Sequence, residues 1–483
     1  MRRLGMALLA FFGIACIAAA ITIPTYLVPK LKVVPLDLDI TSDSTSIAAL
    51  NNTGERFPAV IFDRCSVSED RAKLLTVSLK QQRRSVVVDP SDADQATIQA
   101  GQSVLVDRIR EENGEEVHPT VAPADSERTC RDGLLTANID RVSLDRKTSA
   151  PNGVISSLQM EADPEGVPVE DVSVRLDDRK GFQYKFGFDV QKQDYYYYDL
   201  NTRADAVAKF VEETTINGLK VYHFRADVPE TDISNLPNPQ GEAPLGTILT
   251  MPAEWWGITG QGVRPNTPVT MHRHAAAVRN VWVEPVTGTI VDGYEEQHQY
   301  FKSPEGTEDL PEAITGFQMD ALKANFKLTD QTVSEQTDRA KEYVNLLKWG
   351  GTYVPIILGV LGALLLILWG WLTFRGRDDD GTGNDAPRGG APTGDEAAEP
   401  VYTTPEAPTE VLGTDTSGPP AGRGPGATAS AAAGGAALSA DEYWAPETPT
   451  TTAERVDTEA DTIVFEPIPD PEAPSAPRHG RTD

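Results

Sequence analysis

Three histidines are the residues of this chain whose types and spacing come closest to a metal site. His272 and His274 are two positions apart, which on a β-strand puts both rings on one face, and His298 lies on a strand that we expect to be a neighbour. A metal site needs three or more ligands at fixed geometry. Histidines that pack in the core or lie at the surface explain the same residues. We favour that interpretation and expect neither a metal nor a cofactor.

Two aromatic clusters are the candidates for ligand binding, and their members are Tyr195, Tyr196, Tyr197, Tyr198, Trp255 and Trp256. On a strand, four consecutive tyrosines put two rings on each face. Aromatic rings offer apolar area with a polar tip, so they can stack on sugar rings or line a lipid cavity. An ordinary two-sided strand core explains the same run, and both interpretations stay open.

The chain has no recognisable nucleophile motif. Paired acids such as Glu295-Glu296 and Asp177-Asp178 could serve glycoside chemistry only if two carboxyls stood about 5–9 Å apart in a cleft. In a chain with a formal net charge of -29, solvated surface is the simpler explanation. We therefore expect that the protein is not an enzyme. The same charge argues against nucleic acid as a partner, because basic groups supply that affinity.

Two uncharged apolar segments, residues 4–28 and 353–374, enclose most of the chain. Each exceeds the roughly 20 residues that cross the hydrocarbon core of a bilayer. The first is longer than the apolar core of a cleaved signal peptide, which is about 7–15 residues. We therefore predict five parts in order: an N-terminal transmembrane helix (1–28), an extracytoplasmic domain (29–329), a helical stalk (330–352), a C-terminal transmembrane helix (353–374) and a disordered tail (375–483).

Cysteine use bears on the orientation of these parts. Cys65 and Cys130 are the only cysteines outside the apolar segments. A lone pair in a large block fits a disulfide formed in an oxidising compartment; two buried free thiols are the alternative. We predict a two-pass plasma-membrane protein with both termini in the cytoplasm and the central domain outside.

Period-two alternation and β-branched runs make the central domain β-rich. Expected strands lie near residues 36–40, 85–89, 103–109, 134–144, 182–190, 195–199 and 219–228. Residues 280–300 read as a hairpin, with Gly288 in its tight turn. The predicted fold class is α+β, with antiparallel sheets tethered by two transmembrane helices.

The tail is rich in Pro, Gly, Ala, Thr and acids, and it cannot bury enough apolar area to fold. Within it, Thr462 has acids before it and Ile463, Val464 and Phe465 after it. This pattern suits some bacterial receptor-type Ser/Thr kinases, and a phosphate there would offer a docking point for a forkhead-associated reader. An inert tail with a chance match is the alternative.

Four motifs in combination point to a known family: Leu36-Asp37-Leu38 after the first span, Phe186-Gly187-Phe188-Asp189, the tyrosine run followed by Asp199, and Val283-Glu284-Pro285-Val286-Thr287-Gly288. Together they resemble a family of actinobacterial two-span membrane proteins labelled the porin PorA family, over roughly residues 1–374. The resemblance implies an envelope protein of mycolic-acid bacteria and their relatives. Some members are linked to the maturation of lipomannan toward lipoarabinomannan, and the family has no agreed catalytic residues.

The function expected from these observations is binding or transfer of a lipid or lipoglycan by the extracytoplasmic domain, with the aromatic clusters as the contact surface. A scaffold or regulator of envelope glycosyltransferases, controlled through the tail, is the alternative. A pore ranks lower, because an outer-membrane barrel has many lipid-facing strands and no long apolar helix. A glycan-modifying enzyme also ranks lower.

Overall fold

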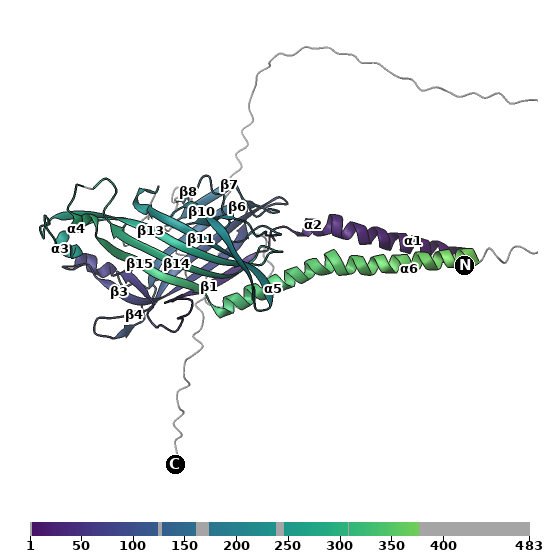
Figure 1. Ribbon diagram of the computed structural model, residues 1–483, viewed down its shortest axis with the longest axis horizontal. Coiled ribbons are helices and arrows are strands. Elements are labelled where there is room, and N and C mark those ends of the chain that lie inside the picture. The colour runs from purple at the N-terminus through teal and green to yellow at the C-terminus, as the bar shows by residue number, and fades with distance from the viewer. Residues whose placement is uncertain (1, 124–127, 161–172, 238–245, 308, 376–483) are drawn as a thin grey trace, which may run out of the picture. The chain divides into compact units, whose positions relative to one another are not determined.

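The computed structural model describes residues 2–123, 128–160, 173–237, 246–307 and 309–375. These fall into two compact units: one holds residues 2–15 and 362–375, and the other holds the described residues from 16 to 361. Figure 1 shows the β-sheet of the larger unit and the long helices α1 and α6. The predicted disordered tail lies outside the described residues, apart from Arg375.

Helices lie at both ends of the described chain. At the start, α1 (Arg2–Thr22) leads into the π-helical turn η1 (Ile23–Leu27) and α2 (Val28–Leu31). At the end, α5 (Asp330–Lys348) leads through the π-helical turn η4 (Trp349–Tyr353) into α6 (Val354–Arg375). The helical runs Leu4–Leu31 and Asp330–Arg375 are both long and apolar enough to cross a membrane. The prediction of two apolar helices is therefore confirmed.

Local sequence explains where α5 begins. Thr329 is its N-cap and accepts a hydrogen bond from the Thr332 main-chain N–H. Asp330 in the first turn and Lys348 in the last turn interact favourably with the helix dipole.

Four short helical elements lie elsewhere: η2 (Arg64–Ser68), η3 (Ile233–Asn235), α3 (Ala253–Trp256) and α4 (Glu312–Thr315).

Fifteen strands of the described chain form one sheet, and every strand pair in it is antiparallel. The strands are β1 (Asp39–Ile47), β2 (Ala59–Phe62), β3 (Leu74–Val88), β4 (Gln95–Arg110), β5 (Glu116–Val117), β6 (Leu134–Asp145), β7 (Pro151–Gln159), β8 (Ser173–Arg175), β9 (Tyr195–Asp199), β10 (Ala204–Ile216), β11 (Leu219–Asp232), β12 (Ile248–Pro252), β13 (Pro268–Val283), β14 (Ile290–Lys302) and β15 (Gln318–Leu328). The prediction of a β-rich antiparallel domain is confirmed.

The first and last strands lie side by side in the middle of this sheet. The order is β8-β7-β6-β4-β3-β1-β15-β14-β13-β11-β10-β9, and Ser44 of β1 pairs with Leu328 of β15. The sheet therefore consists of two halves, each built mostly from neighbours in sequence, that join along β1 and β15.

The two edges of the sheet also approach each other. Leu158 of β7, Val174 of β8 and Tyr198 of β9 belong to one buried apolar cluster. Between the edges, the Arg179 guanidinium contacts the Asp140 carboxylate of β6 at 2.9 Å, and both side chains are buried. The sheet is thus curled, with one concave face.

The concave face changes character along β3. Alternation places Val77, Leu79, Gln81 and Arg83 on the same face. Val77 and Leu79 are fully buried against apolar residues of β4 and β15. Gln81 and Arg83 instead border a cavity. One end of the curled sheet is therefore an apolar core, and the other encloses polar side chains.

The predicted strand at residues 182–190 is wrong, because in the structure these residues form bends with a single isolated bridge between Phe182 and Tyr197. A Cβ at Gly187 would stand 2.7 Å from the Thr148 main-chain O, so the segment fits closely against its neighbours. By contrast, β13 and β14 form the predicted hairpin, with Gly288 at a φ of 73° in the turn. A disulfide joins Cys65 to Cys130, and Cys16 is free.

Candidate functional site

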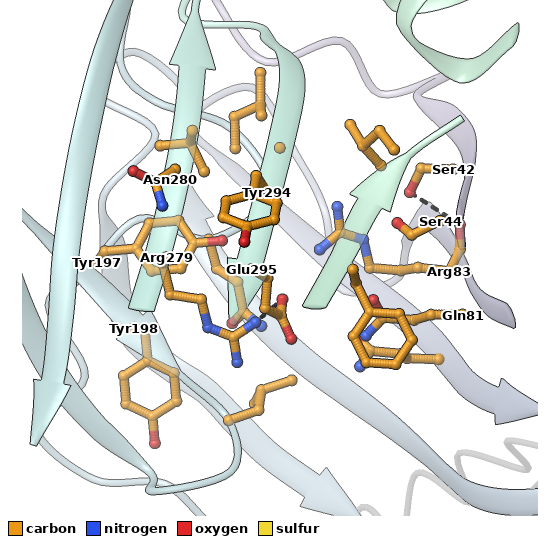
Figure 2. Close-up of a pocket in the computed structure, with 18 of the residues that line it drawn as sticks. Ser42, Ser44, Gln81, Arg83, Tyr197, Tyr198, Arg279, Asn280, Tyr294 and Glu295 are labelled. Carbon is orange, nitrogen blue, oxygen red and sulfur yellow. Dashed lines mark hydrogen bonds and ion pairs between the residues drawn. The ribbon is translucent and has the colours of Figure 1, made fainter. Parts of the chain in front are cut away.

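The concave face encloses a polar cavity of about 80 Å³ (Figure 2), with walls from β1, β3, β4, β9, β13, β14 and β15. Such a volume holds several water molecules, since each needs roughly 10–15 Å³. Polar or charged groups dominate the lining: Ser42, Ser44, Gln81, Arg83, Gln102, Tyr197, Arg279, Asn280, Tyr294 and Glu295. The cavity is therefore suited to water and small polar solutes rather than to an apolar chain.

Arg279 is the centre of an ion-pair network on one wall. Its Nε and Nη2 donate to Asp199 Oδ2 at 2.9 and 2.5 Å, and its Nη1 contacts Glu295. Burial alone raises the pKa of Asp199, but the Arg279 charge and hydrogen bonds from Thr202 outweigh it, so this pKa lies below its ordinary value. One cation is shared by two carboxylates, and Glu295 Oε1 is buried with no hydrogen-bond partner in the described part of the chain.

Arg83 enters the cavity from β3 (Figure 2). Its guanidinium carbon lies 5.4 Å from the centroid of the Tyr184 ring, and its main-chain O accepts a hydrogen bond from Ser42 Oγ at 3.5 Å. Its Nε is buried without a hydrogen-bond partner, and no described carboxylate forms an ion pair with it. This cation therefore faces the cavity without a counter-charge.

The three histidines do not share one site. His272 Nδ1 lies 2.8 Å from Asp232 Oδ2, whereas His298 Nε2 lies 2.7 Å from Asp320 Oδ1. His274 is buried, and burial lowers its pKa despite the nearby Asp232 carboxylate. Among the described residues, no group of three or more His, Cys, Asp or Glu is arranged to hold a metal ion.

The structure separates the two aromatic clusters. Tyr197 and Tyr198 are buried and border the cavity, Tyr195 packs edge-on against Phe186, and Tyr196 is half exposed. The indoles of Trp255 and Trp256, in contrast, are 3% and 2% exposed. They belong to a separate apolar cluster with Met271 and Phe301. Only the tyrosine run borders the polar cavity.

The motif 186–189 and the hairpin turn at 284–288 meet in space, although about 100 residues separate them. The Phe186 N–H donates to Gly288 O at 2.9 Å, and the Val190 N–H donates to Pro285 O at 2.7 Å. A Cβ on Gly288 would stand 2.2 Å from Gly187 O, so only glycine allows this close approach. The sequence carried both motifs but gave no sign of their contact.

The place where residues 186–189 meet the hairpin turn, called the junction below, also contacts the segments that enter and leave the sheet. Lys32 Nζ, just after α2, bonds to the Asp189 carboxylate at 2.6 Å. Phe188 packs edge-on against Tyr343 of α5, with ring centroids 6.1 Å apart, and the Tyr343 hydroxyl donates to Leu31 O at 2.8 Å. The motif 186–189, held against the hairpin turn, therefore contacts both helical connections.

Lys185, beside this junction, is a buried lysine. Its Nζ donates to Phe186 O at 3.0 Å and to Thr287 O, and it stands 3.9 Å from the centroid of the Phe188 ring. Burial lowers the pKa of Lys185 to about 7, and the Glu284 carboxylate offsets only part of that effect.

Between pH 7 and about 10.5, folded Lys185 is neutral while the unfolded lysine stays protonated, so the unfolded state binds one more proton. The free energy of unfolding should therefore rise with pH by about 1.4 kcal/mol per pH unit from this group. Lys185→Met should lack that rise, as measured by denaturant unfolding at pH 7.0, 8.0 and 9.0. Lys192→Met removes an exposed lysine paired with Glu213 and should keep it. Equal slopes in the wild type and Lys185→Met would contradict the assignment.

Comparison with known proteins identifies the family. The model of the family described as Porin PorA matches residues 6–371. A protein named Porin PorA from Corynebacterium amycolatum is 30% identical over 403 residues, covering 76% of this chain and 97% of its own. Another of the same name from Corynebacterium resistens is 28% identical over 416 residues, covering 76% and 96%.

The chain belongs to the porin PorA family. The resemblance inferred from the four motifs is thereby confirmed, and the apolar helices together with the family make it a membrane-associated protein. Both similar proteins are named porins, a name given to channel proteins.

The expected lipid or lipoglycan function was wrong, and so was the ranking of a pore below it, because both similar proteins are named porins. The same finding overturns the alternative of a glycosyltransferase scaffold. The structure agrees with this correction: the cavity of this PorA-family chain is polar, and Trp255 and Trp256 are buried in a separate apolar cluster. Thr462, with its expected kinase and forkhead-associated reader, lies outside the described residues and stays a prediction.

Proposed function

We propose that this protein forms a pore for small polar solutes in a membrane of the cell envelope. The observation that carries the proposal is the family match over residues 6–371, which takes in the sheet and nearly all of both long helices. The polar cavity inside the sheet fits a protein that handles small hydrophilic solutes, although it lies outside the proposed path through the bilayer.

In this proposal α1 and α6 cross the plasma membrane, both termini are cytoplasmic and the sheet domain lies outside. The apolar runs Leu4–Leu31 and Asp330–Arg375 support the two crossings. The disulfide between Cys65 and Cys130 supports the outer location of the sheet, because such bonds persist in oxidising compartments.

The outer face of the sheet is not built for hydrocarbon. Arg84 pairs with Asp39 at 2.8 Å, and Lys80 pairs with Asp107 at 2.8 Å. Alternation along β1 and β3 turns the side chains of Asp39, Lys80 and Arg84 away from the cavity. A lipid-facing strand carries apolar residues at such positions. We therefore propose that the path through the bilayer is made by α1 and α6 of several copies, since two helices alone enclose no channel.

The test is conductance of the purified full chain in planar lipid bilayers, with detergent alone as the blank. Discrete current steps that grow in number with protein concentration are the expected result. Bilayers that stay silent, while the protein is shown by flotation to have inserted into vesicles of the same lipid, would overturn the proposal.

Two glycines of α1 offer a matched pair of variants. A Cβ at Gly13 would stand 2.8 Å from the Leu366 side chain of α6, whereas a Cβ at Gly5 would meet nothing within 4 Å. Gly13→Leu should push the helices apart at a cost of about 1–3 kcal/mol, and so reduce the number of conducting events by about tenfold or more. Gly5→Leu should leave them unchanged. The same count for both variants would show that α1 and α6 do not pack together in the conducting state.

A further inference from the structure

We propose that the cavity inside the sheet is a binding site for a small zwitterion of the size of glycine, with its carboxylate at Arg83 and its ammonium at Glu295. The site is separate from the proposed pore through the bilayer, and it can be measured in detergent without any conductance.

Two opposite charges with unmet bonding capacity line this one cavity. Arg83 Nε and Glu295 Oε1 are both buried and both lack a hydrogen-bond partner among the residues that the structure describes. Leaving a buried polar or charged group unsatisfied is costly, so each position favours a partner of opposite character. Figure 2 shows Arg83 and Glu295 entering the cavity from separate strands.

The sheet keeps these charges from neutralising each other. Arg83 is on β3 and Glu295 is on β14, and β1 and β15 lie between those strands. Arg279 already occupies the other side of Glu295 and is itself bonded to Asp199. These three residues carry one excess negative charge, while Arg83 carries one positive charge with no carboxylate in ion-pair contact within the described chain.

The remaining lining suits the same ligand. A guanidinium presents a planar fork of donors that matches the two oxygens of a carboxylate. Gln81 and Gln102 add neutral amide groups, and Ser42 and Ser44 add hydroxyls. The volume of about 80 Å³ has room for several water-sized groups, which is enough for glycine but not for a large side chain.

A matched set of three ligands tests the proposal on the wild-type full chain in detergent micelles. Isothermal titration with glycine, acetate and methylammonium at constant ionic strength compares the zwitterion with each half of its charge. Glycine should bind at least about tenfold more tightly than either of the other two, since only glycine satisfies both walls. Absence of heat with all three ligands would overturn the proposal, and acetate binding as tightly as glycine would replace it with a simple anion site.

Neighbouring residues on the same strands provide matched variants. Arg83→Gln and Glu295→Gln should each weaken glycine binding by at least about tenfold. Arg84→Gln and Glu296→Gln remove the same charges one position along, where alternation turns the side chains away from the cavity, and should leave binding unchanged. Glycine binding that survives Arg83→Gln in a variant with a wild-type circular dichroism spectrum would contradict the assignment. Glu295→Gln also removes a contact of Arg279. The Arg83 variant and the comparison of the three ligands therefore decide whether the proposed site exists.

Discussion

Replacing Asp140 with Asn is expected to lower the free energy of unfolding by about 3–5 kcal/mol. Asp140 accepts hydrogen bonds from Arg179 Nη1 at 2.9 and 3.0 Å and from the Tyr184 hydroxyl at 2.6 Å. The Arg179 and Asp140 side chains are 2% and 0% exposed. The variant leaves a buried guanidinium without its counter-charge, at the place where the two edges of the sheet approach each other.

Denaturant unfolding of the full chain measures this effect, and Asp177→Asn is its control. Asp177 pairs with Arg175, and both side chains are about 70% exposed, so that variant should change stability by less than about 1 kcal/mol. The double variant Asp140→Leu with Arg179→Met should recover much of the loss, because a buried pair replaced by apolar groups is often near neutral. If Asp140→Asn were as stable as Asp177→Asn, the pair would not hold the edges.

Removing the disulfide is expected to destabilise the sheet domain by about 4 kcal/mol. Cys65 and Cys130 are 65 residues apart in sequence, and closing a loop of that length restricts the unfolded chain by about this amount. The double variant Cys65→Ser with Cys130→Ser, measured by the same unfolding assay, should show the loss.

Cys16→Ser is the matched control, because Cys16 is the remaining cysteine of the chain and is free. Reducing agent should lower the stability of the wild type and of Cys16→Ser equally, and it should not affect the double variant. A reducing agent that leaves the wild type unchanged would show that the bond adds nothing to the stability of the sheet.

Elements whose cause is local were predictable from the sequence. Alternation and turn chemistry placed the hairpin of β13 and β14, and the apolar runs placed α1 and α6. The prediction of a strand at 182–190 was wrong. The aromatic alternation there is that of a strand, but Gly187 and the contacts of Phe186 and Val190 bend the segment onto the turn at 285–288. Local pattern carries no information about such a distant partner.

The cavity could not be predicted, because its walls depend on pairings between distant strands. Arg83 and Arg84, or Glu295 and Glu296, look equivalent in the sequence, and only the register of β3 and β14 decides which of them faces inward. The expected role of Trp255 and Trp256 in ligand contact could not be judged from the sequence for the same reason. A pair of indoles suits a ligand surface and a core equally well until its neighbours are known.

The central position of β1 sets an order of events during synthesis. Once β3 is made it can pair with β1, but β15, the other neighbour of β1, emerges some 280 residues after it. Until then the nascent half-sheet has β1 as an open edge, the kind of edge that invites aggregation. The sequence of β1, DITSDSTSI, is rich in hydroxyls and carries two carboxylates. The polar strand β1 thus makes most of the edge that waits for β15, and only the short apolar strand β2 completes it. The docking of the two halves along β15 should be the slow, final step of folding.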